Sequence, residues 1–390
     1  MKRFFRRLCL VLTPLCIAVQ ATIGFYAASV PSAYVVAAGE DLTLPAPLTA
    51  SGTAKDATVR LLGVFPVKQV AVKEAGDMDV VLGGTVFGMK LYTSGVLVVG
   101  LTDVDTASGR CRPAADAGIC VGDVIEAING QKVTTKGEVA TLLERSGGRG
   151  VTVQVRRDGI SFPVQFAPVL STGEGRYKAG LWVRDSSAGI GTMSFYVPAT
   201  GVFAGLGHPI CDVDTGETLP ISGGEIVPAR VYSITKSVRG DAGELCGGFD
   251  GTGCGTLTVN GKTGVYGLCQ KPVTGELVTV APRQEVTTGP ARILCTLDDS
   301  GPQWFDIQIT KVRYSGSEPH MDVKVTDPEL LKQTGGIVRG MSGSPIMQKG
   351  KLVGAVTHVL VNDPTRGYAI FAETMLDTAN QVAAGQKAAS

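Results

Sequence analysis

The sequence has little histidine, few aromatic residues and almost no net charge. Its 390 residues contain only three histidines (His208, His320 and His358), 6% aromatic residues and a formal net charge of +1. Beyond the N-terminus the basic residues do not cluster, which argues against a nucleic-acid partner. No CxxC pair occurs, and three histidines are too few to complete a zinc site. We therefore expect no metal, no cofactor and no bound nucleic acid.

A long hydrophobic run occurs at one place, directly behind a basic N-terminus. Four cations within residues 2–7 precede an uncharged, mostly apolar run from 8 to about 28. About twenty apolar residues are enough to span a bilayer, and the basic flank should stay in the cytoplasm. We expect a membrane anchor followed by an exported chain. A cleaved signal peptide, favoured by small residues near 29–38, is the alternative.

Seven of the nine cysteines lie outside this run. An exported chain can form disulfides, and two pairs are close enough in sequence to consider, Cys111 with Cys120 and Cys246 with Cys254. The odd number leaves at least one thiol without a partner in the chain.

Abundant glycine, 52 residues, together with many valines and threonines indicates β-structure with tight turns. We predict four segments: a basic end with an anchor or signal at 1–37, a linker with a small β-element at 38–80, a compact module at 81–169 and a larger domain at 170–390. The last contains short strands at roughly even spacing, which is typical of a β-barrel or sandwich.

A serine between glycines is the strongest chemical signal. In the hexapeptide GMSGSP at 340–345, small neighbours would let a substrate carbonyl approach the Ser342 hydroxyl. The N–H groups of Gly340 and Ser342 would then form an oxyanion hole. A plain β-turn between two strands is the structural alternative.

A nucleophilic serine needs a base whose pKa is near neutral. His208 lies in the segment GLGHPI, in a tight loop after an apolar stretch, and is our candidate for that base. A solvated or structural loop histidine is the alternative reading.

The module at 81–169 resembles a PDZ domain of the kind associated with bacterial proteases. The resemblance rests on residues 118–123 and on an Asn-Gly turn at 129–130, followed by a predicted helix at 138–145. It implies a peptide groove beside a strand, with a carboxylate-binding loop near Phe87, Gly88, Met89 and Lys90. Structural packing for the following domain, without a peptide ligand, is the alternative.

Three longer pieces carry a second resemblance: RDSSAGIGTMSFY, GLGHPICDVDTG and VTDPELLKQTGGIVRGMSGSPIMQKGKLVGAVTHVLVNDPTRGY. Together with the PDZ-like module and the N-terminal anchor, they resemble the stage IV sporulation protein B family of signalling serine peptidases. The resemblance covers nearly the whole chain from about residue 55. It implies a mainly β fold in which the PDZ-like module precedes a chymotrypsin-like double β-barrel.

The resemblance also implies site residues. His208 would be the general base, Asp327 the acid that orients it and Ser342 the nucleophile. The strand containing Thr357 and His358 would form a wall of the primary specificity pocket.

Asp327 lies in an unusual place for a catalytic acid, since 342 − 327 = 15 residues separate it from the serine. In most double-barrel proteases the acid lies nearer the histidine. Asp212, Asp214 and Asp322 are competing candidates. An Asp before Pro is also well suited to cap a helix, so Asp327 can be read as an N-cap.

The resemblance implies a membrane-tethered, extracytoplasmic serine endopeptidase in the space between forespore and mother cell. It would cleave itself near its N-terminus. Self-association for cleavage in trans, and release of the protein from the membrane after cleavage, are two further expectations. It would also cleave a membrane-bound regulator of an intramembrane metalloprotease. The alternatives are a PDZ adaptor with an inactive protease-like domain, and a quality-control protease.

Overall fold

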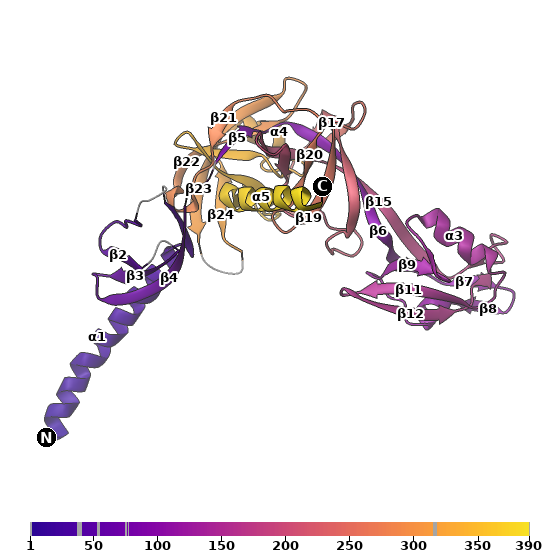
Figure 1. Cartoon of the computed structure of the whole chain (residues 1–390), viewed down its shortest axis with the longest axis horizontal. Coiled ribbons are helices and arrows are strands. Elements are labelled where there is room, and N and C mark those ends of the chain that lie inside the picture. The colour runs from indigo at the N-terminus through magenta and orange to yellow at the C-terminus, as the bar shows by residue number, and fades with distance from the viewer. Residues whose placement is uncertain are drawn as a thin grey trace.

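The computed structural model describes residues 2–36, 41–52, 55–74, 76, 78–314 and 318–389. It contains an N-terminal helix, a small β-module and two β-barrels, from one of which a further module projects (Figure 1). Each module, and each barrel, encloses buried apolar side chains of its own.

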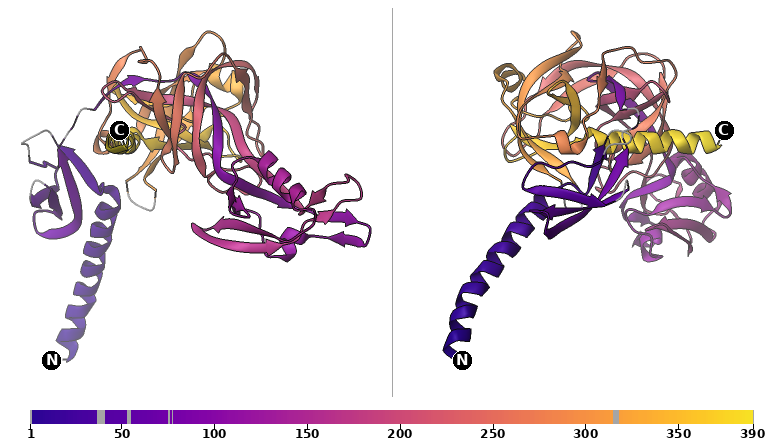
Figure 2. Two further views of the ribbon diagram at one scale, coloured as in Figure 1. Left: turned by 45° about the vertical axis from the view of Figure 1, so that its right-hand side comes forward. Right: turned by 60° about the vertical axis from the view of Figure 1, so that its left-hand side comes forward.

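The N-terminal helix α1 (Lys2–Ser29) extends away from the rest of the molecule (Figures 1 and 2). Its segment Leu12–Ser29 has a mean hydropathy of 1.4 and is 0% buried, and it is the one helix among the described residues that is long and apolar enough to cross a membrane. A four-stranded sheet of order β1-β4-β3-β2 follows, in which β1 is parallel to β4. Its strands are β1 (Ala33–Val36), β2 (Leu48–Gly52), β3 (Asp56–Leu61) and β4 (Phe65–Glu74).

The first barrel is a ring of six strands that closes through pairing of its two longest strands, β6 and β15. In ring order they are β6 (Val86–Leu101), β17 (Ile221–Thr235), β19 (Gly255–Gly261), β20 (Gly264–Cys269), β16 (Val202–Gly205) and β15 (Leu181–Val197). Three further strands extend the sheet: β5 (Asp79–Leu82), β21 (Leu277–Thr279) and β18 (Glu244–Phe249).

The PDZ-like module is inserted into this barrel. β6 and β15 run on beyond the ring as a two-stranded ribbon, and the module lies at its far end (Figure 2). Its elements are β7 (Val104–Thr106), β8 (Gly109–Cys111), α2 (Pro113–Asp116), β9 (Val124–Ile128), β10 (Gln131–Lys132), α3 (Lys136–Arg145), β11 (Val151–Arg157), β12 (Ile160–Phe166), β13 (Val169–Leu170) and β14 (Tyr177–Lys178).

This topology differs from the sequential order that we expected. The predicted module at 81–169 includes the first half of β6, which pairs with barrel strands on both sides. The first barrel therefore begins before the module and resumes after it. The predicted helix at 138–145 is present as α3. Its start is fixed by a capping box, in which the Thr135 hydroxyl accepts from the Glu138 amide and the Glu138 side chain accepts from the Thr135 amide.

The second barrel is closed by six strands in the order β22-β23-β24-β27-β26-β25. They are β22 (Gly289–Thr296), β23 (Pro302–Arg313), β24 (His320–Val325), β25 (Pro345–Gln348), β26 (Lys351–Val359) and β27 (Arg366–Phe371), accompanied by the short helices η1 (Arg283–Glu285) and α4 (Pro328–Thr334) and the C-terminal helix α5 (Ala372–Ala389). Met375 and Ala379 of α5 pack in one apolar cluster with Phe195 of the first barrel and Ala355 of the second. The two barrels are thus fixed against each other.

The seven cysteines beyond α1 are free thiols. Neither pair that the spacing suggested, Cys111 with Cys120 or Cys246 with Cys254, is bridged in this structure.

Candidate active site

The loop that carries Ser342 belongs to the second barrel but is held by the first. It connects α4 to β25, and β15 of the first barrel lies against it. The amide of Thr192 donates to the carbonyl of Ser342 at 3.0 Å, and the Thr192 hydroxyl donates to the carbonyl of Gly340 at 2.8 Å. The Ser194 hydroxyl donates to the carbonyl of Gly343 at 2.7 Å. These bonds fix the backbone on both sides of the predicted nucleophile.

Sequence reasoning did not single out Thr192 and Ser194. Both lie in the stretch RDSSAGIGTMSFY that supported the family resemblance. They are two residues apart on a strand, so their side chains face the same side. Two hydroxyl residues at that spacing were the signal that the sequence offered.

Gly343 and Ser344 show why Ser342 is the better nucleophile candidate of the two serines. Gly343 has a φ of +94°, and a Cβ there would lie 2.0 Å from the carbonyl oxygen of Thr192, so only glycine fits. Ser344 is fully buried and its hydroxyl has no hydrogen-bond partner among the described residues. Ser342 is partly exposed. The glycine turns the chain so that the first serine faces solvent and the second faces the core.

Two backbone amides beside Ser342 are available for an oxyanion. Among the described residues, the N–H groups of Gly340 and Ser342 donate no hydrogen bond, whereas the amide of Gly343 is bonded to the carbonyl of Val356 at 2.7 Å. Gly340 has a φ of +96°, a conformation that favours glycine. Free amides in a glycine turn next to a hydroxyl are the arrangement that stabilises a tetrahedral intermediate.

His208 follows β16 through a strained turn. Leu206 and Gly207 both have positive φ, +65° and +72°. The His208 Nδ1 atom is 2.7 Å from the carbonyl oxygen of Pro209, and its ring lies 4.7 Å from the ring of His358, centroid to centroid. Burial lowers the pKa of His208 below its usual value; the hydrogen bond to Pro209 acts in the opposite direction, and the neighbouring His358 lowers the pKa further. The lowered pKa favours the neutral imidazole, the form that can accept a proton.

Ser342 and His208 contact two neighbouring residues of β26, Thr357 and His358. The Ser342 hydroxyl donates to the carbonyl of Thr357 at 2.8 Å, and the ring of the next residue, His358, contacts the ring of His208 at an interplanar angle of 39°. No hydrogen bond between Ser342 and His208 is present among the described residues. Thr357 and His358, which we predicted as pocket wall, thus lie directly beside both residues.

Asp327 caps α4. Its Oδ1 accepts from the amides of Glu329 at 2.9 Å and Leu330 at 3.1 Å, and its Oδ2 accepts from the amide of Asp306 at 3.2 Å. Burial alone would raise the pKa of this carboxyl, but the three amide donors hold its pKa below the usual range. Both carboxylate oxygens are thus engaged by backbone N–H groups.

The register of the second barrel separates Asp327 from His208. Asp322 of β24 pairs with Tyr368, and Tyr368 pairs with His358, the residue whose ring contacts that of His208. Asp327 lies five residues beyond Asp322, roughly 16 Å along an extended chain at about 3.3 Å per residue. The structure does not bring Asp327 to His208, so its role as orienting acid remains a prediction from the resemblance alone.

The competing aspartates are bound to arginines. Arg184 pairs with both Asp212 and Asp214, the latter at 2.7 Å, and Asp322 pairs with Arg313 at 3.1 Å. The acceptor that holds Nδ1 of His208 in this structure is instead the Pro209 carbonyl. Such a bond keeps the proton on Nδ1 and leaves Nε2 free to accept one.

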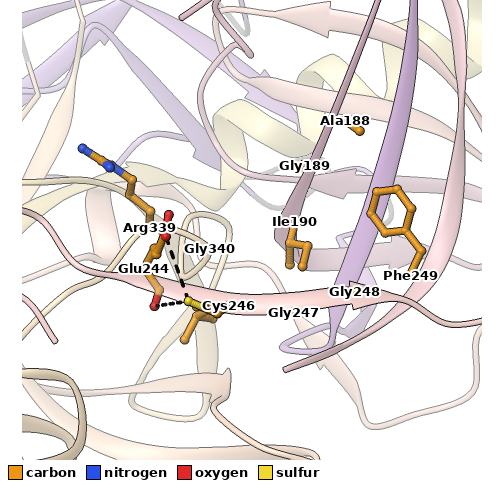
Figure 3. Close-up of a pocket in the computed structure, with 11 residues that line it drawn as sticks. Ala188, Gly189, Ile190, Glu244, Cys246, Gly247, Gly248, Phe249, Arg339 and Gly340 are labelled. Carbon is orange, nitrogen blue, oxygen red and sulfur yellow. Dashed lines mark hydrogen bonds between the residues drawn. The ribbon is translucent and has the colours of Figure 1, made fainter. Parts of the chain in front are cut away.

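A groove of ≈ 520 Å³ opens beside the predicted oxyanion hole. Residues 188–190 of β15 and 244–249 of β18 line it, and Arg339 and Gly340 lie at one end (Figure 3). Gly340 thus belongs both to the groove and to the predicted oxyanion hole.

The loop predicted to bind a peptide carboxylate does not lie in the PDZ-like module. Phe87, Gly88, Met89 and Lys90 form part of β6 inside the first barrel, paired with β15 on one side and β17 on the other. Their backbone amides are therefore occupied, and we correct this prediction. The groove of the PDZ-like module, ≈ 920 Å³, lies instead between α3 and residues 177–183.

Comparison with protein families agrees with this arrangement. The profile described as SpoIVB peptidase S55 matches residues 175–376, which include His208 and Ser342 and exceed half of the chain. The chain belongs to the SpoIVB peptidase S55 family. It is a serine peptidase. A PDZ domain profile matches residues 112–157, which confirms the inserted module.

Solved structures give only distant similarity. An HtrA-type protease, AlgW with a decapeptide, is 12% identical with a TM-score of 0.32, and the match covers 54% of each chain, so this chain spans about half the length of that relative. The active form of the Rv3671c protease from M. tuberculosis is 14% identical with a TM-score of 0.27, over 49% of this chain and 74% of that one. No curated protein matched the sequence.

Proposed function

We propose that this peptidase is a membrane-tethered signalling endopeptidase that acts in sporulation, cleaving itself near its N-terminus and then cleaving an extracytoplasmic regulator of an intramembrane metalloprotease. The observation that carries the proposal is the family membership together with the apolar helix α1, which precedes the catalytic domain in the same chain. The cations in the first two turns of α1 favour a cytoplasmic N-terminus and an external catalytic domain. The family resemblance implies that this domain lies in the space between forespore and mother cell.

The proposed chemistry uses Ser342 and His208. With Nδ1 bonded to the Pro209 carbonyl, the neutral form of His208 would accept the proton of Ser342 at Nε2 as the hydroxyl attacks a peptide carbonyl. A rotation about χ1 of Ser342 would move the hydroxyl from the carbonyl of Thr357 to the imidazole. His208 would then protonate the leaving amine. The amides of Gly340 and Ser342 would stabilise the oxyanion.

The inserted PDZ domain supports a role in holding a partner or the chain itself. One edge of β15 at residues 181–184 pairs with β6, while its other edge is unpaired among the described residues and faces α3. An extended peptide could add to this edge as a further strand.

The N-terminal sequence of the mature protein tests the proposal. We expect the parent chain, produced in vesicles, to acquire a new N-terminus, and Ser342→Ala to keep its original one. Addition of the parent protein to Ser342→Ala should restore the cut if self-cleavage occurs in trans. An unprocessed but fluorophosphonate-reactive parent would refute self-cleavage while leaving the peptidase activity standing.

Two other functions make different predictions. An adaptor with an inactive peptidase domain predicts no labelling of Ser342 by a fluorophosphonate. A quality-control protease predicts broad digestion of denatured proteins, whereas a signalling peptidase should leave most of them intact.

A further inference from the structure

The turn between β3 and β4 combines an unfavourable backbone with an exposed apolar side chain. Leu62 and Gly63 both have positive φ, +53° and +73°, and the amide of Val64 donates to the carbonyl of Leu61 at 3.1 Å. This is the geometry of a type I′ turn, in which Asn or Asp is favoured at the first central position. Here that position is held by a leucine that is 68% exposed. Neither local conformation nor packing explains it.

Two neighbours enlarge the apolar surface. Val64 is 66% exposed and Phe65 is 39% exposed. We call Leu62, Val64 and Phe65 the apolar tip. An exposed apolar surface at the end of a hairpin usually marks a contact with a membrane or another protein.

The register of the small sheet places the apolar tip beside the end of α1. Because β1 and β4 are parallel, with Ala33 opposite Ala71, the residues before each strand also run side by side. The Lys68 ammonium donates to the carbonyl of Val30, just after α1 ends. Phe65 lies three residues before Lys68, so it reaches roughly 10 Å further along α1. Figure 2 shows α1 leaving this module on the side away from the barrels.

The net charge of the small sheet also differs between the end near the apolar tip and the opposite end. Arg60 and Lys68 are the charged residues of β3 and β4 in the half near the apolar tip, whereas the opposite end holds the carboxylates Asp56 and Glu74 beside the cations Lys55 and Lys73. The net positive charge therefore lies near the tip. Lys73, near that opposite end, is paired with Asp377 of α5 at 2.8 Å. Cations around an apolar tip match a lipid surface that carries anionic headgroups.

We propose that the apolar tip inserts into the interface of the anionic bilayer that α1 spans, as a second membrane contact. This inference rests on the proposed role of α1 as a membrane anchor. Two contacts, the helix and the tip, would fix the orientation of the small sheet relative to the bilayer, and so the direction in which the catalytic barrels extend.

Depth-dependent quenching of a single tryptophan tests the proposal. The full-length chain with Ser342→Ala, which prevents self-cleavage, and with Trp182→Phe and Trp304→Phe would receive Val64→Trp. It would be reconstituted into phosphatidylglycerol-containing vesicles with or without lipids brominated near the headgroup. Val238→Trp is the matched control, because Val238 is also an exposed valine in a turn, 60% exposed, but belongs to the first barrel. We expect the brominated lipid to remove about half of the fluorescence at position 64, since interfacial side chains lie roughly 5–10 Å deep, and to leave position 238 unchanged.

A second variant separates insertion from turn structure. In the Val64→Trp background, Leu62→Asn should not lower the melting temperature, because Asn suits the type I′ turn, but it should reduce quenching about twofold as the tip becomes polar. Unchanged quenching in Leu62→Asn would overturn the role of the leucine.

Flotation of the vesicles separates the two inferences. If the protein floats with the vesicles but position 64 is quenched no more than position 238, the insertion is refuted and the anchor stands. If the protein does not float, both are refuted.

Discussion

Substitution of Thr192 tests whether the first barrel positions the Ser342 loop of the second barrel. Its side chain is fully buried, and its hydroxyl donates to the carbonyl of Gly340 at 2.8 Å. Replacement by Val keeps the shape and removes the donor. The carbonyl of Gly340, which is only half-buried, would then lose this hydrogen bond, a loss of about 0.5–1.5 kcal/mol.

Gly340 also supplies one of the two predicted oxyanion amides, so a loss of this order should appear in the rate of reaction. Since about 1.4 kcal/mol corresponds to a tenfold change, Thr192→Val should slow the reaction of Ser342 roughly twofold to tenfold. Thr192→Ser keeps the hydroxyl and should stay close to the parent rate.

The rate constant for labelling of Ser342 by a fluorophosphonate measures this effect without a known substrate. The thermal midpoint of each variant, measured alongside, shows how much of the change is unfolding. Parent-like labelling of Thr192→Val would refute the positioning role. An equal loss in Thr192→Ser would show that the methyl packing, and not the hydrogen bond, is responsible.

Three further substitutions and a pH profile test the site. Ser342→Ala should abolish proteolysis, a loss on the order of a million-fold, whereas Ser344→Ala should be nearly neutral in activity and melting temperature because it removes a buried hydroxyl without a partner; a dead Ser344→Ala would reverse the assignment. Asp327→Asn should remain folded and active, because Asn also caps a helix; a folded variant with a ten-thousand-fold loss in turnover would instead establish the predicted orienting acid. Activity should fall on acidification with a midpoint below about 6.5, because burial lowers the pKa of His208. Unfolded His208 binds its proton at higher pH than folded His208, so the free energy of unfolding should also decrease as pH falls below about 6.5; a midpoint above 7 in either titration would contradict the lowered pKa.

The sequence by itself determined the features that depend on residue type within a short window. Small residues around Ser342, a loop histidine at position 208 and an uncharged apolar run each require particular side chains close together in the chain. The helix α3 was predictable for the same reason, since its capping box joins residues three apart. The capping alternative for Asp327 was likewise visible from the proline that follows it.

Only the tertiary structure decided what depends on pairing between distant segments. Insertion of the PDZ domain into the first barrel follows from the length over which β6 and β15 pair, and placed residues 87–90 in the barrel and not in a peptide-binding loop. The support of the Ser342 loop by Thr192 bridges about 150 residues of chain, and the separation of Asp327 from His208 follows from strand register. Cross-strand register depends on contacts throughout a barrel, so no local pattern contains it.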